Sequence, residues 1–317
     1  MAEQGTATFA SPDDFSAAIG AARLDLFITA GGDFNGRLTW LNLGGLHVLC
    51  GHENLPRIGF LALPPAQAII SFAANREASL TYCGVRMRFG DLVFHGLGER
   101  VHLRTDEEGI WGLISLPPAL LAACSNALTG QSIRPPLEGQ VMRPTLGAAK
   151  NLLGPFSKAC RLVESKRELI SNPEVARALE HELLYALVNC LTVDNVGENP
   201  RRIRRHAAVM GRFEEALAAR NEPHLNVSEL CAAIGVPERT LRQCCTEFLG
   251  MSPTRYYLVR RLNKVRAALR RADPETASVA AIARDHHFLE LGRFAVAYRA
   301  VFHEMPSSTL RRARTKM

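Results

Sequence analysis

The chain has 317 residues, of which 47% are hydrophobic and 22% charged. This composition is typical of a globular protein of about two domains, and it excludes a disordered chain, a collagen and a coiled-coil rod. Charge is divided unevenly: residues 1–200 contain 16 Lys and Arg against 20 Asp and Glu (−4), whereas residues 201–317 contain 22 against 11 (+11). This surplus predicts that the last third of the chain binds a polyanion.

Neither secretion nor a membrane location is expected. The N-terminal residues lack a basic segment followed by an apolar one, so we predict no secretory signal and a cytoplasmic location. Two long uncharged stretches, residues 58–75 and 109–133, are interrupted by Pro64-Pro65 and Pro117-Pro118, so neither predicts a membrane span. The eight cysteines are scattered, and no two of them form a Cys-x-x-Cys motif. We therefore expect reduced thiols, with neither a disulfide framework nor structural zinc.

The sequence pattern of the first part of the chain, residues 1–140, predicts short strands and turns. Of the 24 glycines, 18 precede residue 151, and Gly44-Gly45 separates two strand-like runs in the manner of a hairpin. Strands are predicted over residues 24–29, 37–43, 46–50, 69–72, 79–82, 85–89, 92–94, 101–104 and 110–116, followed by a helix over 119–128. Many short strands at this spacing predict a small β-barrel or cupin-like domain over residues 1–140.

A barrel of this size can hold one small ligand, which predicts a metal-free effector pocket. Its candidate lining residues are the aromatic strand residues Trp40, Phe72 and Trp111, each of which also suits a packing role in the core. The catalytic alternative is a metal-dependent cupin enzyme with a ligand set drawn from His47, His52, Glu53, His95 and His102. No His-x-His pair is followed closely by a Glu, so we favour structural or surface histidines.

Motifs of other enzyme classes are missing as well. The sequence has no nucleophile elbow, no phosphate-binding loop and no glycine motif for dinucleotides. We therefore predict that the chain is not an enzyme, with no catalytic residue, no cofactor and no metal site.

The middle segment, residues 141–200, predicts a helical linker. One helix is expected over residues 145–170, and Asn172-Pro173 is expected to cap and begin a second helix that ends near residue 191. In this second helix an apolar residue recurs every four positions, at Val175, Leu179, Leu183, Leu187 and Leu191. Such a seam either pairs two subunits in a homodimer or packs onto its own chain, and the pattern does not decide between these.

Residues 201–317 predict an all-α domain with two helix-turn-helix motifs. Asn226-Val-Ser-Glu229 is a capping box that begins a short helix, and Gly235 separates this helix from a second one that begins at Pro237. The pattern recurs about 50 residues later, with helices over 279–283 and 291–302. A connecting helix from Pro253 to about Ala272 is roughly 30 Å long, close to the ~34 Å repeat of B-DNA. The two recognition helices should therefore reach successive major grooves on one face of the DNA.

Residues 226–312 resemble the DNA-binding domain of the AraC/XylS family of transcription regulators. The resemblance is carried by Leu241, Gly250, Pro253, Tyr257, Arg261-Leu262, Ile282-Ala283, Phe288, Phe294, Phe302, Pro306 and Arg311. Three positions depart from the family pattern: His287 and Glu304 replace glycines, and Cys245 replaces an aromatic residue. The resemblance implies a bacterial regulator, usually an activator that works with RNA polymerase, whose N-terminal β domain binds a small effector.

Six residues are the candidate contacts to double-stranded DNA. Arg239, Arg242, Gln243 and Thr246 are expected on the polar face of the first recognition helix, and Arg293 and Arg299 on the second. The first set offers more side chains that hydrogen-bond to base edges, so it should carry most of the sequence specificity. We therefore favour a ligand-responsive transcription activator with an α+β fold.

Two other hypotheses remain. One is the cupin-type metalloenzyme fused to a DNA-binding module. The other is an alkyl-damage sensor that transfers a methyl group to a cysteine, which would need clustered cysteines, whereas Cys50 and Cys83 stand alone in the sequence.

Overall fold

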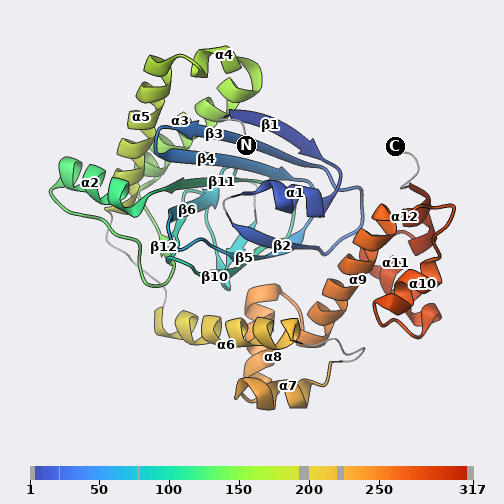
Figure 1. Ribbon diagram of the computed structural model, residues 1–317. Helices are drawn as coiled ribbons and strands as arrows, with labels where there is room; N and C mark the ends of the chain where they lie inside the picture. The colour runs from blue at the N-terminus through green and yellow to red at the C-terminus, as the bar shows by residue number, and fades with distance from the viewer. Residues whose placement is uncertain (1–3, 21, 77–78, 193–199, 220–224, 313–317) are drawn as a thin grey trace.

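The structure, a computed structural model, describes residues 4–20, 22–76, 79–192, 200–219 and 225–312, and in residues 200–204 only the backbone (Figure 1). Its strands form two sheets in which all pairings are antiparallel. The larger sheet has the order β1 (Gln4–Phe9), β3 (Gly36–Leu43), β4 (Leu46–Glu53), β11 (Gly109–Leu116), β6 (Ala68–Ala73), β9 (Leu92–Phe94), β12 (Gln140–Met142). The smaller sheet has the order β2 (Arg23–Ile28), β5 (Arg57–Ala62), β10 (Arg100–Thr105), β7 (Leu80–Tyr82), β8 (Val85–Arg86).

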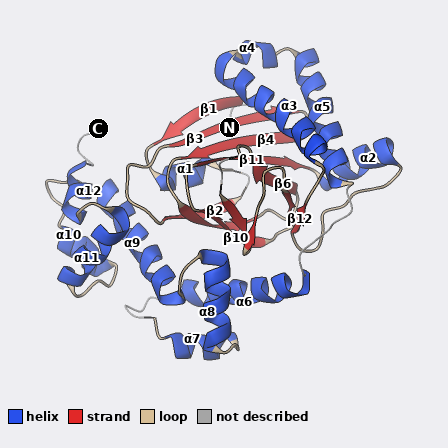
Figure 2. Ribbon diagram, turned by 180° about the vertical axis from the view of Figure 1, so that it is seen from behind, coloured by secondary structure: helices blue, strands red, loops and turns tan. Residues whose placement is uncertain are grey.

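The two sheets face one another around a shared core (Figure 2). Successive strand side chains point to opposite faces of a sheet. Leu49 of β4 is opposite Leu113 of β11, and both join the core between the sheets, whereas their neighbours Val48 and Ile114 join a second core on the outer face. The α+β prediction is confirmed, and the strands form two facing sheets instead of one closed barrel.

Four helices, one from the end of the β domain and three from the linker, cover the outer face of the larger sheet. They are α2 (Pro118–Thr129), α3 (Leu146–Ser165), α4 (Arg167–Ile170) and α5 (Pro173–Leu191). Asn172 caps α5 as predicted, because its side chain accepts a hydrogen bond from the Glu174 N–H at 2.9 Å. Leu179, Leu183 and Leu187 are at most 3% exposed and belong to the outer core. The leucine seam thus packs onto its own chain, the second of the two predicted uses.

The remaining helices lie below and beside the sheets (Figure 1). They are α6 (Pro200–Ala218), α7 (Val227–Ile234), α8 (Glu238–Leu249), α9 (Pro253–Arg271), α10 (Val279–Asp285), α11 (Leu291–Phe302) and α12 (Pro306–Arg312), while a short helix, α1 (Pro12–Ala18), precedes β2. Among the described residues, no helix combines the length and apolar character that crossing a membrane requires.

Helix α9 lies against the outer strand of the smaller sheet. An edge strand leaves backbone groups unpaired, and Asn263 of α9 pairs with those of Ile28 in β2. The Asn263 Oδ1 atom accepts a hydrogen bond from the Ile28 N–H at 3.0 Å, and the Nδ2 atom donates one to the Ile28 carbonyl at 3.0 Å. The ring of Phe27 also meets Tyr256 edge to face at 5.9 Å. The sheets and the C-terminal helices therefore share one continuous core.

Candidate DNA-binding interface

The first helix-turn-helix motif forms as its capping residues predict. Asn226 accepts hydrogen bonds from the N–H groups of Ser228 and Glu229 at 3.1 and 3.3 Å, and its side-chain amide donates to the Glu229 carboxylate at 2.7 Å. Gly235 ends α7 with φ of +68°, and Gly250 ends α8 with φ of +71°. These left-handed conformations favour glycine, so the sequence fixes both ends of the motif.

Helix α8 buries one face and exposes the other. Leu241, Cys244 and Phe248 are at most 2% exposed, and Cys245, at the position where the family has an aromatic residue, is also buried. The four predicted DNA contacts all lie on the exposed side: Arg239, Arg242, Gln243 and Thr246. Their spacing places them along one stripe of the helix.

Hydrogen bonds within the helix already orient this stripe. Arg242 donates to the Glu238 carboxylate at 2.7 Å, and Gln243 donates to Glu247 at 3.1 Å. An exposed ion pair at this spacing contributes about 0.3–0.5 kcal/mol. Arg242 can therefore exchange its bond to Glu238 for one to a base edge or a phosphate at little cost.

The second motif presents a more apolar surface. Phe294, Tyr298 and Phe302 of α11 are at most 2% exposed and belong to the core. The predicted contacts Arg293 and Arg299 are exposed, and Arg293 pairs with Glu290 at 3.0 Å. The side chain of Val296 is 71% exposed and extends the same surface.

The two residues that replace family glycines are His287, in the turn of the second motif, and Glu304, after α11, and arginines of α9 contact both positions. His287 has φ of +62°, a conformation that favours glycine. Arg261 of α9 donates to the carbonyls of His286 and His287 at 2.9 and 2.7 Å and lies over the Phe288 ring. Glu304 accepts hydrogen bonds from Arg266, Thr309 and Arg312 at 2.9–3.1 Å.

A single helix connects the two motifs (Figure 1). α9 has 19 residues, which gives a length of about 28 Å at 1.5 Å per residue. Ser252 caps its start by accepting a hydrogen bond from the Arg255 N–H at 3.3 Å, and its inner face contributes buried Tyr256, Val259 and Leu262. The spacer is therefore fixed along its length by the core.

The three aromatic residues predicted for an effector pocket do not meet. Trp40 and Trp111 pack against the core between the sheets, and the Trp111 indole N–H donates to Glu53 at 2.7 Å. Phe72 lies on the other face of the larger sheet, where its ring meets Phe156 at 4.9 Å. These three side chains therefore do not line one pocket between the sheets.

The proposed metal-ligand set of the cupin enzyme is dispersed. Glu53 forms a buried bidentate ion pair with Arg57, with both N–O distances 3.0 Å. The histidines each have another partner, namely His47 with Asn42, His52 with Glu108, His95 with Ser71 and His102 with Glu214. No group of three side chains suited to hold a metal ion occurs within the part of the chain that the structure describes.

Sequence reasoning missed a buried polar cluster inside the β domain. The Ser71 hydroxyl lies 2.8 Å from His95 Nε2, and His95 Nδ1 lies 3.6 Å from a Glu99 carboxylate oxygen. Glu99 also accepts hydrogen bonds from Tyr82 and from the Gly139 N–H. Ser71 and His95 are 7% and 2% exposed, so the cluster forms part of the domain interior.

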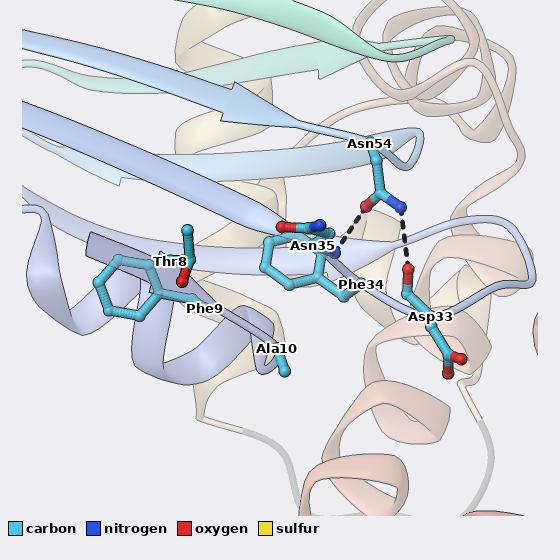
Figure 3. A pocket seen from close by; sticks show the side chains of 7 residues that line it. All are labelled: Thr8, Phe9, Ala10, Asp33, Phe34, Asn35 and Asn54. Atoms are coloured by element: carbon cyan, nitrogen blue, oxygen red, sulfur yellow. Dashed lines mark hydrogen bonds between the residues drawn. The ribbon is translucent and has the colours of Figure 1, made fainter. Parts of the chain in front are cut away.

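Cavities lie where loops and helices meet the β domain, and the strand pattern did not predict them. Figure 3 shows one, of about 560 Å³, lined by Thr8, Phe9, Ala10, Asp33, Phe34, Asn35 and Asn54. Asn54 closes one side, because its side-chain amide bonds to the Asn35 N–H and the Asp33 carbonyl at 2.7 and 2.9 Å. A second cleft lies between β2 and α9.

Residues 230–312 match the family model described as "Helix-turn-helix domain". The XylDLEGF operon transcriptional activator of Pseudomonas putida is 33% identical over 94 residues, which are 30% of this chain and 29% of that protein. The probable thc operon regulatory protein of Rhodococcus erythropolis is 37% identical over 95 residues, again 30% of this chain and 29% of the relative. The matched segment thus spans less than a third of these relatives.

Solved structures include similar chains. The AraC-like transcriptional activator CuxR is 13% identical, with 97% of this chain and 99% of that chain covered and a TM-score of 0.44. A probable AraC family regulator from Rhodopseudomonas palustris is 33% identical, with 33% of this chain and 96% of that chain covered and a TM-score of 0.29.

Proposed function

We propose that the chain, whose C-terminal domain is an AraC/XylS-type helix-turn-helix domain, regulates transcription by inserting two recognition helices into successive major grooves. The observation that carries this proposal is the placement of α8 and α11 at the two ends of α9, each with its arginines exposed. A helix inside a major groove reads the hydrogen-bonding edges of the bases.

The two recognition helices divide the work. Arg239, Arg242 and Gln243 of α8 have side chains suited to guanine or adenine edges, each worth about 1–3 kcal/mol of discrimination. On α11 only Arg293 and Arg299 offer charge, and Val296 is suited to apolar contact with thymine methyl groups. The first motif therefore carries most of the specificity, and the second supplies register and backbone contacts.

The N-terminal β domain binds a small-molecule effector, and the regulator acts as an activator with RNA polymerase in the cytoplasm of a bacterium. Supporting this assignment are the relatives named above, which are operon regulators, and the continuous core between the β domain and the DNA-binding helices. A homodimer would have to use a surface other than the leucine seam of α5, which is buried in the chain.

The test is footprinting of the full-length chain on genomic DNA, followed by binding at several salt concentrations. Protection should cover two successive major grooves on one face. The logarithm of affinity should fall linearly with the logarithm of salt, by about 0.9 for each phosphate neutralised. A footprint limited to one groove, or binding without a salt slope, would contradict the proposal.

A further inference from the structure

A cleft of about 600 Å³ lies where the β domain meets the helix that joins the two DNA-binding motifs. One wall comes from α1 and β2, and the other from α9. Two carboxylates line it, Asp13 and Asp25, against six cationic side chains: Arg23, Arg260, Lys264, Arg266, Arg270 and Arg271. Pockets of this size hold small organic ligands.

The positive charge in this cleft is only partly neutralised by the protein. Ion pairs bind Arg260 to Glu214, Arg266 to Glu304 and Arg271 to Asp13. With Glu214 and Glu304 added to the two lining carboxylates, six cations face four anions, which leaves a charge of +2. Arg270 donates to the carbonyl of Ala10. Across the described residues, neither Arg23 nor Lys264 has an ion-pair partner, and both are exposed.

One buried cation in the cleft has unused hydrogen-bond donors. Arg266 is 3% exposed, and its Nη2 atom donates to the Gly32 carbonyl and to Glu304. Its Nε and Nη1 atoms are buried without a hydrogen-bond partner among the described residues. A buried donor without a partner costs about 1–3 kcal/mol, more when it is charged. A ligand oxygen that reaches these donors would recover this cost.

The cations of the cleft also disfavour one another. Burial and the neighbouring charge of Arg266 lower the pKa of Arg270. Burial and the charge of Lys264 likewise lower the pKa of His286, a further lining residue. Binding an anion among these groups would relieve both repulsions.

We propose that this cleft binds a small organic oxyanion, a carboxylate or a phosphate ester, in contact with both β2 and α9. This inference rests on the proposed function, because it supplies the chemical class of the effector and its place. Since α9 carries a recognition motif at each end, an anion that contacts both walls binds the docked arrangement of the helices more tightly than a separated one. Such differential binding is what shifts a conformational equilibrium.

The experiment is calorimetric titration of the full-length chain, without DNA, with inorganic phosphate, glycerol 3-phosphate and succinate. Glycerol is the neutral probe and should not bind. A preference for glycerol 3-phosphate or for succinate decides between a phosphate ester and a carboxylate. The proposal is wrong if none of the three anions binds at millimolar concentration.

Two matched double variants locate the site. Arg23→Gln with Lys264→Gln removes the two exposed cations without a partner, and the dissociation constant should rise by about tenfold or more, because charge-assisted hydrogen bonds are lost. Arg86→Gln with Lys150→Gln removes the same charge from exposed positions outside the cleft and should change it by less than about twofold. Equal losses in the two double variants would show that the anion responds only to net charge.

DNA binding by the same variants distinguishes this inference from the proposed function. In the absence of the anion, the cleft double variant should bind DNA as tightly as the control double variant. A selective loss of DNA affinity would assign the cleft cations to DNA phosphates and overturn the inference. Failure of the unmodified chain to bind DNA would overturn the proposed function, while leaving the anion titration interpretable.

Discussion

His287 adopts a backbone conformation that usually requires glycine. Its φ of +62° lies in the left-handed region, at the position where the family usually has glycine. This conformation costs an L-residue about 1–2 kcal/mol, a cost that glycine avoids. Glycine loses more backbone entropy on folding, however, and this loss offsets part of the gain in stability. We expect His287→Gly to raise the free energy of unfolding by about 0.5–1 kcal/mol, measured by urea denaturation.

The neighbouring histidine provides the control. His286 has φ of −97° and ψ of 21°, which any residue adopts. His286→Gly should lower the free energy of unfolding by about 0.5–1 kcal/mol, since only the entropy cost remains. If both variants change stability in the same direction, His287 stores no strain.

Arg242 and Arg299 test how the recognition helices divide specificity. Both side chains are exposed, but Arg242 lies in the stripe of α8 that we assign to base edges. Arg242→Ala should relax preference at one base pair by about 1–3 kcal/mol, whereas Arg299→Ala should weaken binding to all sequences about equally. Selection of preferred sequences from a random DNA pool measures both effects. If Arg242→Ala keeps the preferred sequence while Val296→Ala changes it, the assignment is reversed.

Helical spacing predicted the orientation of side chains better than the strand pattern did. Helical spacing placed Arg239, Arg242 and Arg293 on exposed faces, because that spacing depends only on the helix itself. The effector aromatics depended on which face of a sheet each residue occupies. Phe72 lies on the outer face and Trp111 on the inner face of the larger sheet, and a strand pattern that is apolar on both faces does not reveal this.

At the scale of elements, the segments bounded by glycine or proline were predictable. Glycine and proline mark the ends of α2, α7 and α8, and these helices form within a residue or two of expectation. The missed elements include α1, α12 and the strands β1, β5 and β12. β1 consists mainly of small and polar residues, and its formation depends on pairing with β3. After its first residue, Arg57, β5 lies within a continuous uncharged stretch, where no alternation of polar and apolar residues indicates a strand.

Asn263 tests the contact between α9 and the edge of β2. Alanine at this position leaves the N–H and the carbonyl of Ile28 without their side-chain partners. We expect Asn263→Ala to lower the free energy of unfolding of the full chain by about 1–3 kcal/mol. The control is Asn151→Ala, at an exposed position of α3, which should be neutral or slightly stabilising because alanine favours helices. Equal stability of the two variants in urea denaturation would show that the amide contributes nothing to docking.

At the scale of the whole molecule, the β domain and the C-terminal helices are each predictable from their own sequence patterns. The contacts that join these two parts are not revealed by any local pattern. Glu214 of α6 is 3% exposed and accepts hydrogen bonds from Tyr256 of α9 at 2.8 Å and from His102 of β10 at 2.9 Å. Arg260 of α9 forms an ion pair with its second carboxylate oxygen. These residues are 42 to 112 positions from Glu214 in the sequence. Only the folded chain brings them together.

Glu214 therefore makes the attachment of the two parts dependent on pH. Burial alone raises the pKa of its carboxyl group, but the hydrogen bond with His102 and the charge of Arg260 outweigh burial and lower the pKa below its ordinary value of 4.5. A carboxyl group with a lowered pKa in the folded state stabilises that state fully above its ordinary pKa. This contribution is lost as the pH falls through the folded-state value.

Glu214→Gln tests this attachment in the full-length chain. Removing one partner of a buried ion pair costs about 3–5 kcal/mol, because the remaining charge stays buried. We expect that loss in the free energy of unfolding at neutral pH, measured by urea denaturation. The difference from the unmodified chain should shrink as the pH is lowered below 4.5, where the carboxyl group becomes protonated.

Glu215 is the matched control, since it is the next residue of α6 and also contacts a residue of β10, Arg100. Its ion pair with Arg100 has an N–O distance of 3.0 Å, but the two side chains are 64% and 56% exposed. Glu215→Gln should change the free energy of unfolding by less than about 1 kcal/mol at any pH, because water screens exposed ion pairs. A similar loss in both variants would show that charge on α6, and not the buried contacts of Glu214, attaches the DNA-binding helices to the sheets.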